Sequence, residues 1–414
     1  MMPATAASTL IAGFLPLLDS AILVVAREKG FAAQEGLRLE LKRETSWASI
    51  RDRLAVGHFD AAHMLAPMPI AANLGLTPWP QRLIAPMALG LGGNAVTVSQ
   101  SVWQAMQAEG AAPGLEARRN GQALAAVVAD RTRQGQAPLR FAVVHPHSGH
   151  NYELRYWLAA SGIHPDRDVE IMIVPPPLMA DALGSGSIDG YCVGEPWNSL
   201  GVARGAGRIV TTKSDIWRSS PEKVLGLSEA VYQRDPPRVE ALVRALHTAS
   251  LWCGAVENLA ELADILARPD YLDMDAGLIA RGLSGRLEIG TDAWVTVDGF
   301  FIPADRAATF PWKSHALWFY SQMLRWSQTV PVAQGADIAR ATYRPDIFRK
   351  ALAPLGVALP GASAKVEGSL PSPIPVGATR DQLMLGPDGF FDGMIFDPDR
   401  LDAYLAELRR IDSL

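Results

Sequence analysis

Segments with strand and helix patterns alternate regularly along the first 90 residues, and this alternation restricts the possible architectures more than any other property of the chain. Residues 37–42 alternate apolar and polar side chains, as a half-buried strand does. Ser46 then precedes a helical pattern that ends at Gly57, and residues 58–64 form the next expected strand. Strands and helices at this spacing predict βαβ units and a mainly parallel sheet.

The same alternation continues through the middle of the chain, so we expect a second α/β unit there. The expected strands lie at 94–99, 141–144, 170–174 and 190–193, and the expected helices at 104–136, 149–160 and 179–184. Further helical patterns cover 236–266, 311–327 and 398–411. Residues 359–375 are rich in Pro, Gly and Ser without a period, which indicates an extended arm over the surface.

We therefore predict an α/β protein of two lobes, each with a mainly parallel or mixed sheet flanked by helices, that enclose a ligand cleft. A chain of 414 residues exceeds the usual size of one hydrophobic core, which also favours two domains. The second lobe is expected as an insertion into the first. The predicted boundaries are 1–92 for the first part of lobe I, 93–222 for lobe II, 223–358 for the second part of lobe I, and 359–414 for a C-terminal arm and closing helix.

The composition excludes several classes of protein. With 49% hydrophobic and 20% charged residues, the chain is neither disordered nor a coiled coil. The formal net charge is −5 and no strongly basic stretch occurs, so we do not expect direct binding to nucleic acid or to an anionic membrane. Cys192 and Cys253 lie far apart in sequence without metal-ligand spacing, so we expect two buried free thiols.

The apolar run near the N-terminus is predicted to be part of the fold and not a targeting segment. No Lys or Arg precedes it, Pro16 and Asp19 interrupt it, and neither an A-x-A cleavage pattern nor a lipid-acceptor cysteine follows. We expect a buried strand at 10–13 and a helix at 23–29 instead of a secretory signal or a membrane-spanning helix. The sequence therefore predicts a cytoplasmic protein.

Several segments, taken in order, resemble the nitrate- and bicarbonate-binding proteins of ABC transporters. They fall within residues 10–410 and are GFLPLLDSA (13–21), EKGF followed by EGL (28–37), SWASIRD (46–52), AAHMLAPMP (61–69), RYWLAASGIHPDRDVEIMIVPPP (155–177), DGYCVGEPWN (189–198), PEKVLGL (221–227) and FFDGMIFDPDRLDAYL (390–405). The resemblance implies a clamp like that of type II periplasmic binding proteins, with one small anion between the lobes.

The resemblance also implies a set of ligand-binding residues. The indole N–H of Trp47 and the ring of His150 are expected to donate hydrogen bonds to the anion. Lys223 is expected to neutralise the anion, which in turn supplies the partner that a buried ammonium needs. Gly194 lets its backbone N–H approach the ligand closely. Asn94 stands where the nitrate-transport proteins of this family carry glutamine, a longer amide with the same donor.

Two acidic residues are expected behind these ligand-binding residues. A carboxylate repels nitrate, so Glu195 is predicted to orient Lys223 or His150 instead of contacting the anion. Asp19 follows the first strand and is predicted to cap a helix N-terminus.

Nitrate or nitrite is favoured over bicarbonate as the ligand. Nitrate is a planar monoanion that needs several donors and about one compensating positive charge. Bicarbonate also needs an acceptor for its hydroxyl group, and the bicarbonate-binding members of the family are expected to supply a carboxylate or hydroxyl, often with a metal ion. No additional acidic cluster occurs in the matching segments. A metal site of His145, His147 and His150 is a weaker alternative without a carboxylate at a matching offset, so we expect no metal and no cofactor.

The missing export signal points to one branch of the family. In this respect the protein resembles the cytoplasmic NasS-type nitrate/nitrite sensors. The resemblance implies a partner protein of the NasT type, which is an ANTAR-domain RNA-binding antiterminator that the sensor releases when it binds the anion. One alternative is the nitrate-binding component of an ABC transporter whose export signal is missing from this sequence. An enzyme on the same fold is a further alternative, but Cys192 has no adjacent base in sequence and no cofactor motif occurs, so we expect no catalytic residues.

Overall fold

Two mixed five-stranded sheets form the centres of two lobes in the computed structural model, which describes residues 8–79, 81–380 and 382–412. Across the first sheet the strands are β2 (Leu37–Arg43), β1 (Ser8–Phe14), β3 (Ala61–Leu65), β11 (Lys223–Ser228) and β4 (Leu83–Ala88). β1 is parallel to β2 and β3, whereas β11 is antiparallel to both of its neighbours.

The second sheet repeats this pattern. Across it the strands are β10 (Gly207–Thr212), β6 (Asn94–Ser99), β9 (Gly190–Gly194), β7 (Leu139–Val143) and β8 (Val169–Ile173). β7 is parallel to β8 and β9, whereas β6 is antiparallel to β9 and β10. Each sheet thus has one antiparallel strand, and it is the strand that the chain forms directly after crossing from the other lobe.

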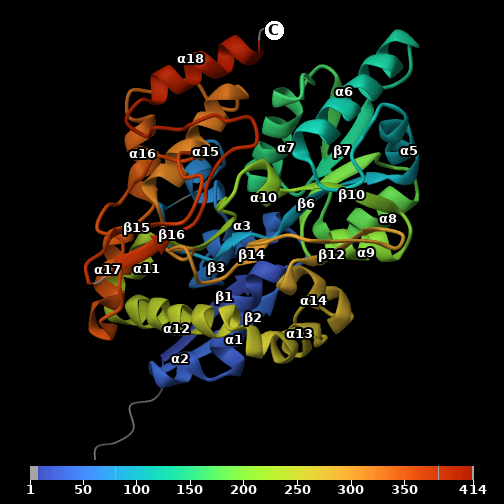
Figure 1. Ribbon diagram of the computed structural model, residues 1–414. Coiled ribbons are helices and arrows are strands. Elements are labelled where there is room, and N and C mark those ends of the chain that lie inside the picture. The colour runs from blue at the N-terminus through green and yellow to red at the C-terminus, as the bar shows by residue number, and fades with distance from the viewer. Residues whose placement is uncertain (1–7, 80, 381, 413–414) are drawn as a thin grey trace, which may run out of the picture.

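Helices flank both sheets (Figure 1). The first lobe carries α1 (Ala21–Glu28), α2 (Phe31–Gln34), α3 (Trp47–Ala55), α4 (Met68–Asn73), α11 (Glu229–Arg234), α12 (Pro236–Gly254), α13 (Leu259–Ala267) and α14 (Ala276–Ser284). The second lobe carries α5 (Gln100–Ala108), α6 (Ala117–Arg133), α7 (Gly149–Ala160), α8 (Met179–Gly184), α9 (Trp197–Ala203) and α10 (Lys213–Ile216). The C-terminal part of the chain forms α15 (Lys313–Arg325), α16 (Gly335–Thr342), α17 (Pro345–Leu352) and α18 (Leu401–Asp412).

Two chain segments that connect the lobes run next to each other. The backbone N–H of Gly92, on the way out of the first lobe, donates to the carbonyl of Ser220 over 2.9 Å, and that of Leu89 donates to Lys223 over 2.9 Å. A short strand, β14 (Phe301–Ile302), pairs with β5 (Leu91–Gly92) at the same place. A hinge motion of the lobes would act on these connections.

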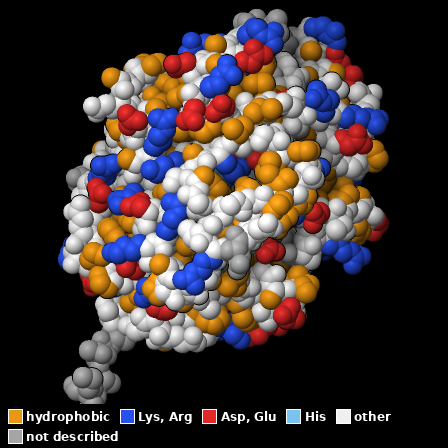
Figure 2. All heavy atoms as spheres, turned by 60° about the vertical axis from the view of Figure 1, so that its left-hand side comes forward, with side chains coloured by type: hydrophobic (Ala, Val, Ile, Leu, Met, Phe, Trp, Pro, Cys, Tyr) orange, Lys and Arg blue, Asp and Glu red, His pale blue; other side chains and the backbone are white. Residues whose placement is uncertain are grey.

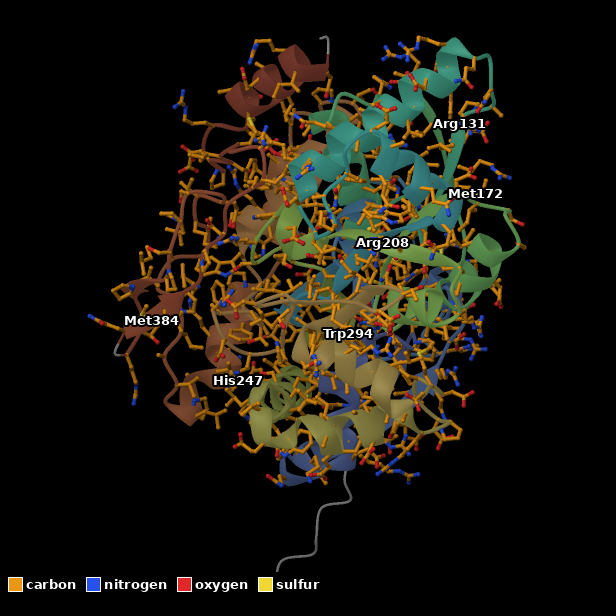
Figure 3. All side chains as sticks on the ribbon, turned by 45° about the vertical axis from the view of Figure 1, so that its right-hand side comes forward. Arg131, Met172, Arg208, His247, Trp294 and Met384 are labelled. Atoms are coloured by element: carbon orange, nitrogen blue, oxygen red, sulfur yellow. The ribbon has the colours of Figure 1, made fainter. Side chains whose placement is uncertain are left out.

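A hairpin also reaches from the first lobe to the second. It consists of β12 (Arg286–Gly290) and β13 (Ala293–Thr296), and β12 packs against α9 and β10. The guanidinium of Arg208, on β10, lies 4.3 Å from the centre of the Trp103 ring. In Figure 3, Arg208 lies above Trp294, an exposed side chain of this hairpin. Opening of the lobes must therefore move or release the hairpin.

The C-terminal part of the chain touches both lobes. α16 packs against α4 of the first lobe, and α15 and α18 pack against α7 of the second. The Trp217 ring lies 4.6 Å from the rings of both Trp318 and Phe390. Figure 1 shows this segment in orange and red along the left side of both lobes. It contacts the second lobe through this buried aromatic cluster and the first lobe through α16.

The expected extended arm at 359–375 has no regular structure until β15 (Ile374–Gly377) begins and pairs with β16 (Gln382–Leu385). Glu367 anchors the arm, because it is fully buried and contacts Lys365, whose ammonium lies 2.8 Å from Asp388.

On the face in Figure 2, basic and acidic side chains are mixed, without a large area of one sign.

The sequence-based expectations can be compared with these elements. Strand 94–99 and helices 149–160 and 179–184 have the predicted bounds. The single helix expected over 104–136 is wrong: α5 and α6 are separated by residues 109–116, which include two glycines and a proline. The pattern over 236–266 is likewise broken, between α12 and α13.

Other expectations have mixed outcomes. Cys192 and Cys253 are buried free thiols, as predicted. The strands of the first sheet come from residues 8–88 and 223–228, and those of the second from 94–212; the predicted domain boundaries themselves stay a prediction. The prediction that the N-terminus is not a targeting segment depends partly on residues 1–7, which lie outside the described residues. Among the residues that are described, no helix is both long and apolar enough to span a bilayer.

Candidate functional site

Strand ends from both lobes meet beside the connecting segments. Asn94 is the first residue of β6 and pairs in register with Gly194, the last residue of β9. Lys223 is the first residue of β11 in the other lobe. All three are buried. Side chains at the carboxyl ends and switch points of such sheets face the space between the lobes, which is the usual ligand position in open α/β folds.

Two helix N-termini add aromatic side chains at the same place. Ser46 caps α3, with its hydroxyl oxygen accepting from a backbone N–H over 3.2 Å, and Trp47 is the first residue of that helix. Ser148 caps α7 in the same way over 3.0 Å, and His150 is its second residue. The first turn of a helix carries a partial positive charge, so both helices favour an anion beside Trp47 and His150.

Several buried polar atoms at this junction have no hydrogen-bond partner among the residues that the structure describes. They are Nε1 of Trp47, Nδ1 of His63, Nε2 of His150 and both amide atoms of Asn94. Their side chains are at most 1% exposed. An isolated buried polar atom of this kind costs about 1–3 kcal/mol, so several in one place indicate a site that is completed by a polar ligand.

The missing side chain of Gly194 lies next to two of these unpartnered groups. A Cβ built on this glycine lies 3.2 Å from Oδ1 of Asn94 and 3.8 Å from Nε2 of His150. Glycine thus leaves space between two of the unpartnered groups, and this is a requirement for close backbone approach to a small ligand.

Lys223 is held by two carboxylates. Its Nζ donates to Oδ2 of Asp19 and to Oε1 of Glu222, each over 2.8 Å. It also lies 5.4 Å from the centre of the Trp47 ring, in cation–π range. The expectation that an anion supplies the partner of this ammonium is therefore wrong. A fully buried ammonium needs ionic partners in every state, and here the protein provides them.

Asp19 connects Lys223 to His63. Oδ1 of Asp19 lies 2.9 Å from Nε2 of His63, and the His63 ring lies 5.5 Å from the Trp47 ring. Burial opposes ionisation of Asp19, but attraction to Lys223 and His63 outweighs it and lowers its pKa to about 2. Burial lowers the pKa of His63 more than Asp19 raises it. At neutral pH the pair is therefore a carboxylate beside an uncharged imidazole.

Glu222 joins Lys223 to a second lysine and to His150. Oε1 lies 3.2 Å from Nδ1 of His150, and Oε2 accepts from Lys213, which also lies 2.8 Å from Glu153. Burial opposes ionisation of Glu222, but His150, Lys213 and Lys223 hold its pKa well below the ordinary value. Burial lowers the pKa of His150 to about 3 and raises that of Glu153 to about 7.

Comparison with known proteins places this arrangement in a family. The profile of the NMT1-like family matches residues 4–267. The nitrate/nitrite binding protein NrtA of Synechococcus elongatus is 31% identical over 408 residues, which cover 96% of this chain and 85% of NrtA. The chain belongs to the NMT1-like family.

Two further relatives of this NMT1-like protein are informative. The nitrate import ATP-binding protein NrtC of Synechocystis is 36% identical over 352 residues, and the chain spans only half of the length of that relative. The crystal structure of the periplasmic nitrate-binding protein NrtA from Synechocystis superposes with a TM-score of 0.84 at 26% identity, covering 97% of this chain and 98% of that one. The predicted two-lobed α/β fold of the periplasmic-binding-protein type is confirmed.

The fold of this NMT1-like protein brings together all five residues that were predicted to bind the ligand, Trp47, Asn94, His150, Gly194 and Lys223. Their contact with an anion stays a prediction. The helix-capping role of Asp19 is wrong, because α1 follows without a side-chain cap and the Asp19 carboxylate contacts Lys223 and His63. It does lie directly behind Lys223, as expected.

The predicted role of Glu195 is wrong. Its carboxylate accepts from the backbone N–H of Ser199 over 3.1 Å, and its Cβ and Cγ lie against Gly282 of α14. Among the described residues no ionic contact joins it to Lys223 or His150. Its side chain therefore interacts with its own turn, because the chain enters α9 directly after it. Glu222 contacts both residues that Glu195 was expected to orient.

Four residues of the site were not singled out from the sequence: His63, Glu153, Lys213 and Glu222. His63 and Glu222 lie within matched segments, and His63 interrupts an otherwise apolar buried strand, which is a usable signal. Glu153 and Lys213 carry no such signal. The matching segments carry no acidic cluster in sequence, but the fold gathers Asp19, Glu153 and Glu222 at the site, each beside a lysine.

The three neighbouring histidines do not converge on one point. Nδ1 of His147 lies 3.1 Å from the hydroxyl of Tyr152, and the rings of His145 and His147 are 5.8 Å apart, whereas His150 faces Glu222. Within the described parts of the chain, no group of three or more His, Cys, Asp or Glu side chains is arranged to hold a metal ion.

Proposed function

We propose that this protein binds nitrate or nitrite between its lobes. The observation that carries the proposal is the set of buried, unpartnered groups on Trp47, His63, Asn94 and His150 beside Lys223. Asn94 and His150 lie beside the Cβ position of Gly194 in the second lobe, and Trp47 and His63 of the first lobe contact each other, with Trp47 also beside Lys223. Several donors around a small planar anion, with a lysine nearby, suit a weakly basic oxyanion, and the relatives named NrtA bind nitrate or nitrite.

The proposal includes a preference over bicarbonate. Bicarbonate needs an acceptor for its hydroxyl group, and the carboxylates of Asp19 and Glu222 are already engaged. Asp19 contacts Lys223 and His63, and Glu222 contacts Lys223, Lys213 and His150. A hydroxyl-free anion makes no demand on these oxygens. We assign no catalytic role, since the site offers donors and ion pairs but its carboxylates and lysines are mutually neutralised.

Isothermal titration of the full chain with nitrate, nitrite and bicarbonate, without added metal, tests this proposal. We expect micromolar binding of nitrate or nitrite and much weaker binding of bicarbonate. Trp47→Phe serves as a matched variant, because it keeps an aromatic ring in the core but removes the indole N–H. Preferential binding of bicarbonate, or nitrate affinity that is unchanged in Trp47→Phe, would contradict the proposed site.

We also propose that the protein is a cytoplasmic sensor whose anion-dependent state is read by an ANTAR-domain RNA-binding antiterminator. The burial of the site supports this proposal, because an anion can enter only if the lobes move. A partner that binds only the anion-free arrangement of the lobes is then released when the anion binds. Because the net charge of this protein is −5, we expect the partner, and not this protein, to bind the RNA. The alternative is the nitrate-binding component of an ABC transporter.

Two experiments separate these roles. Pull-down of the antiterminator by this protein, with and without nitrate, is expected to show capture that the anion abolishes. Fractionation of the source cells is expected to place the native protein in the cytoplasm. Recovery outside the membrane, together with capture of a permease and not of the antiterminator, would favour the transporter component.

A further inference from the structure

His150 faces a carboxylate on one side and the candidate anion site on the other. Its Nδ1 lies 3.2 Å from Oε1 of Glu222, which is an ion-pair distance, and neither ring nitrogen has a hydrogen-bond partner among the described residues. The position of a Cβ on Gly194 is 3.8 Å from this Nε2. Nε2 is therefore the atom of His150 that meets a ligand in the space beside Gly194.

An uncharged imidazole has only one N–H, and the position of that proton decides what Nε2 can do. Glu222 is ionised and can only accept, because two lysines contact it. Because this carboxylate lies 3.2 Å from Nδ1, its negative charge favours the single proton of uncharged His150 on Nδ1. Nε2 then presents a lone pair to the site, and a lone pair repels the oxygens of nitrate, which are acceptors only.

His63 repeats this arrangement in the first lobe. Its Nε2 lies 2.9 Å from Oδ1 of Asp19, and both of its ring nitrogens lack a hydrogen-bond partner in the described part of the chain. Lys223 contacts both backing carboxylates, Asp19 and Glu222. The site thus has two carboxylate-backed histidines, and neither can donate to an anion while its ring is uncharged.

We infer that nitrate binds together with one proton, which His150 takes up at Nε2 while Nδ1–H remains directed at Glu222. This inference rests on the proposed nitrate-binding function and extends it. The bound pair is an imidazolium and a nitrate, which is electrically neutral. Nitrate binding then adds no net charge to a buried site in which Lys213 and Lys223 already face three carboxyl groups and leave no surplus positive charge for an anion.

The surroundings of His150 fix the direction of the pH dependence. The charged groups that act on it are Glu222 and Lys223 of the returning chain, Lys213 at the start of α10, and Asp19 of the first lobe. Burial lowers its pKa to about 3, so the free protein holds the ring uncharged at neutral pH. A bound anion raises that pKa, hence the complex holds more protons than the free protein, and nitrate affinity increases as the pH falls.

Calorimetric titration of the full wild-type chain with sodium nitrate tests proton uptake directly. Titrations at one pH in buffers of different ionisation enthalpy are repeated from pH 8 to pH 5.5 at constant ionic strength. We expect a heat that depends on the buffer, proton uptake that rises toward one per nitrate, and affinity that increases by up to tenfold for each pH unit. Nitrate binding with buffer-independent heat and flat affinity overturns the inference but leaves the proposed function intact. Failure to bind nitrate at any pH overturns both.

Variants locate the proton. His150→Gln keeps an N–H donor that does not titrate, so we expect weaker nitrate binding without proton uptake or pH dependence. Glu153→Gln and His63→Gln remove the other titratable candidates and are expected to keep the uptake. Uptake that persists in His150→Gln and disappears in one of the other two overturns the assignment to His150. Circular dichroism and thermal melting verify folding of each variant. His150→Asn replaces any His150→Gln protein that does not fold, and the wild-type titration decides the uptake independently.

Discussion

Gly194→Ala is a sharp test of the site because one methyl group enters the space where the anion is proposed to lie. The added Cβ lies 3.2 Å from Oδ1 of Asn94, 3.2 Å from Cδ2 of Leu17 and 3.8 Å from Nε2 of His150. An anion oxygen bonded to Asn94 or His150 must lie about 2.9 Å from the donor nitrogen. We therefore expect the methyl carbon to displace an anion oxygen that lies beside Gly194 between these two side chains.

The size of the effect follows from the bonds that are lost. Hydrogen bonds to a charged group contribute about 1.5–3 kcal/mol each, so the loss of two weakens nitrate binding by about 3–6 kcal/mol, or roughly 10²- to 10⁴-fold. The fold is expected to change little. Gly194 is not among the glycines with positive φ, and the two tightest contacts are with side-chain ends that can shift. We expect a change in the free energy of unfolding within about 1 kcal/mol.

Titration calorimetry with nitrate and urea unfolding of the same preparations measure both quantities. Gly377→Ala is the matched control, because Gly377 also ends a strand, has no positive φ and has open space around its Cβ position. We expect wild-type nitrate affinity for this control. If Gly194→Ala binds nitrate as tightly as the wild type, the anion does not lie between Asn94 and His150, and the reasoning is refuted.

Three further variants test neighbouring parts of the site. Trp47→Phe is expected to weaken nitrate binding by about 1–3 kcal/mol in calorimetry through loss of one donor, and an unchanged affinity would make Trp47 a packing residue only. Lys223→Met leaves the carboxylate of Asp19 buried without an ammonium and Glu222 with Lys213 alone, so we expect urea unfolding to show a loss of about 3–5 kcal/mol; a loss below about 1 kcal/mol contradicts the buried ion pairs. Burial raises the pKa of Glu195 from 4.5 to about 7, so its ionisation destabilises the folded state as the pH rises through this interval. Glu195→Gln should therefore gain up to about 3 kcal/mol of stability at pH 8 and almost none at pH 4, and equal gains at both values would contradict the raised pKa.

The order of strands and helices was largely predictable because it depends on local patterns. Burial on one face of a strand requires alternation, and this locates β2; serine caps locate the starts of α3 and α7. The break between α5 and α6 was not predicted. The alanine-rich segments on both sides favour a helix, and this signal outweighed the two glycines and the proline between them. The packing of the C-terminal helices against both lobes depends on distant aromatic contacts, such as Trp217 with Phe390, which no local pattern reveals.

The sequence by itself determined the two-lobed α/β architecture and the buried thiols, because periodicity is carried by neighbouring residues. The five residues that the fold brings together were predicted from the resemblance to a known family. Only the tertiary structure decided the charges around that set. Glu222 is adjacent to Lys223 in sequence, but Asp19, Lys213 and Glu153 come from separate elements. Coulomb energy depends on distance in space, so the partners of a buried lysine and the protonation of His150 are set by how the lobes fold together.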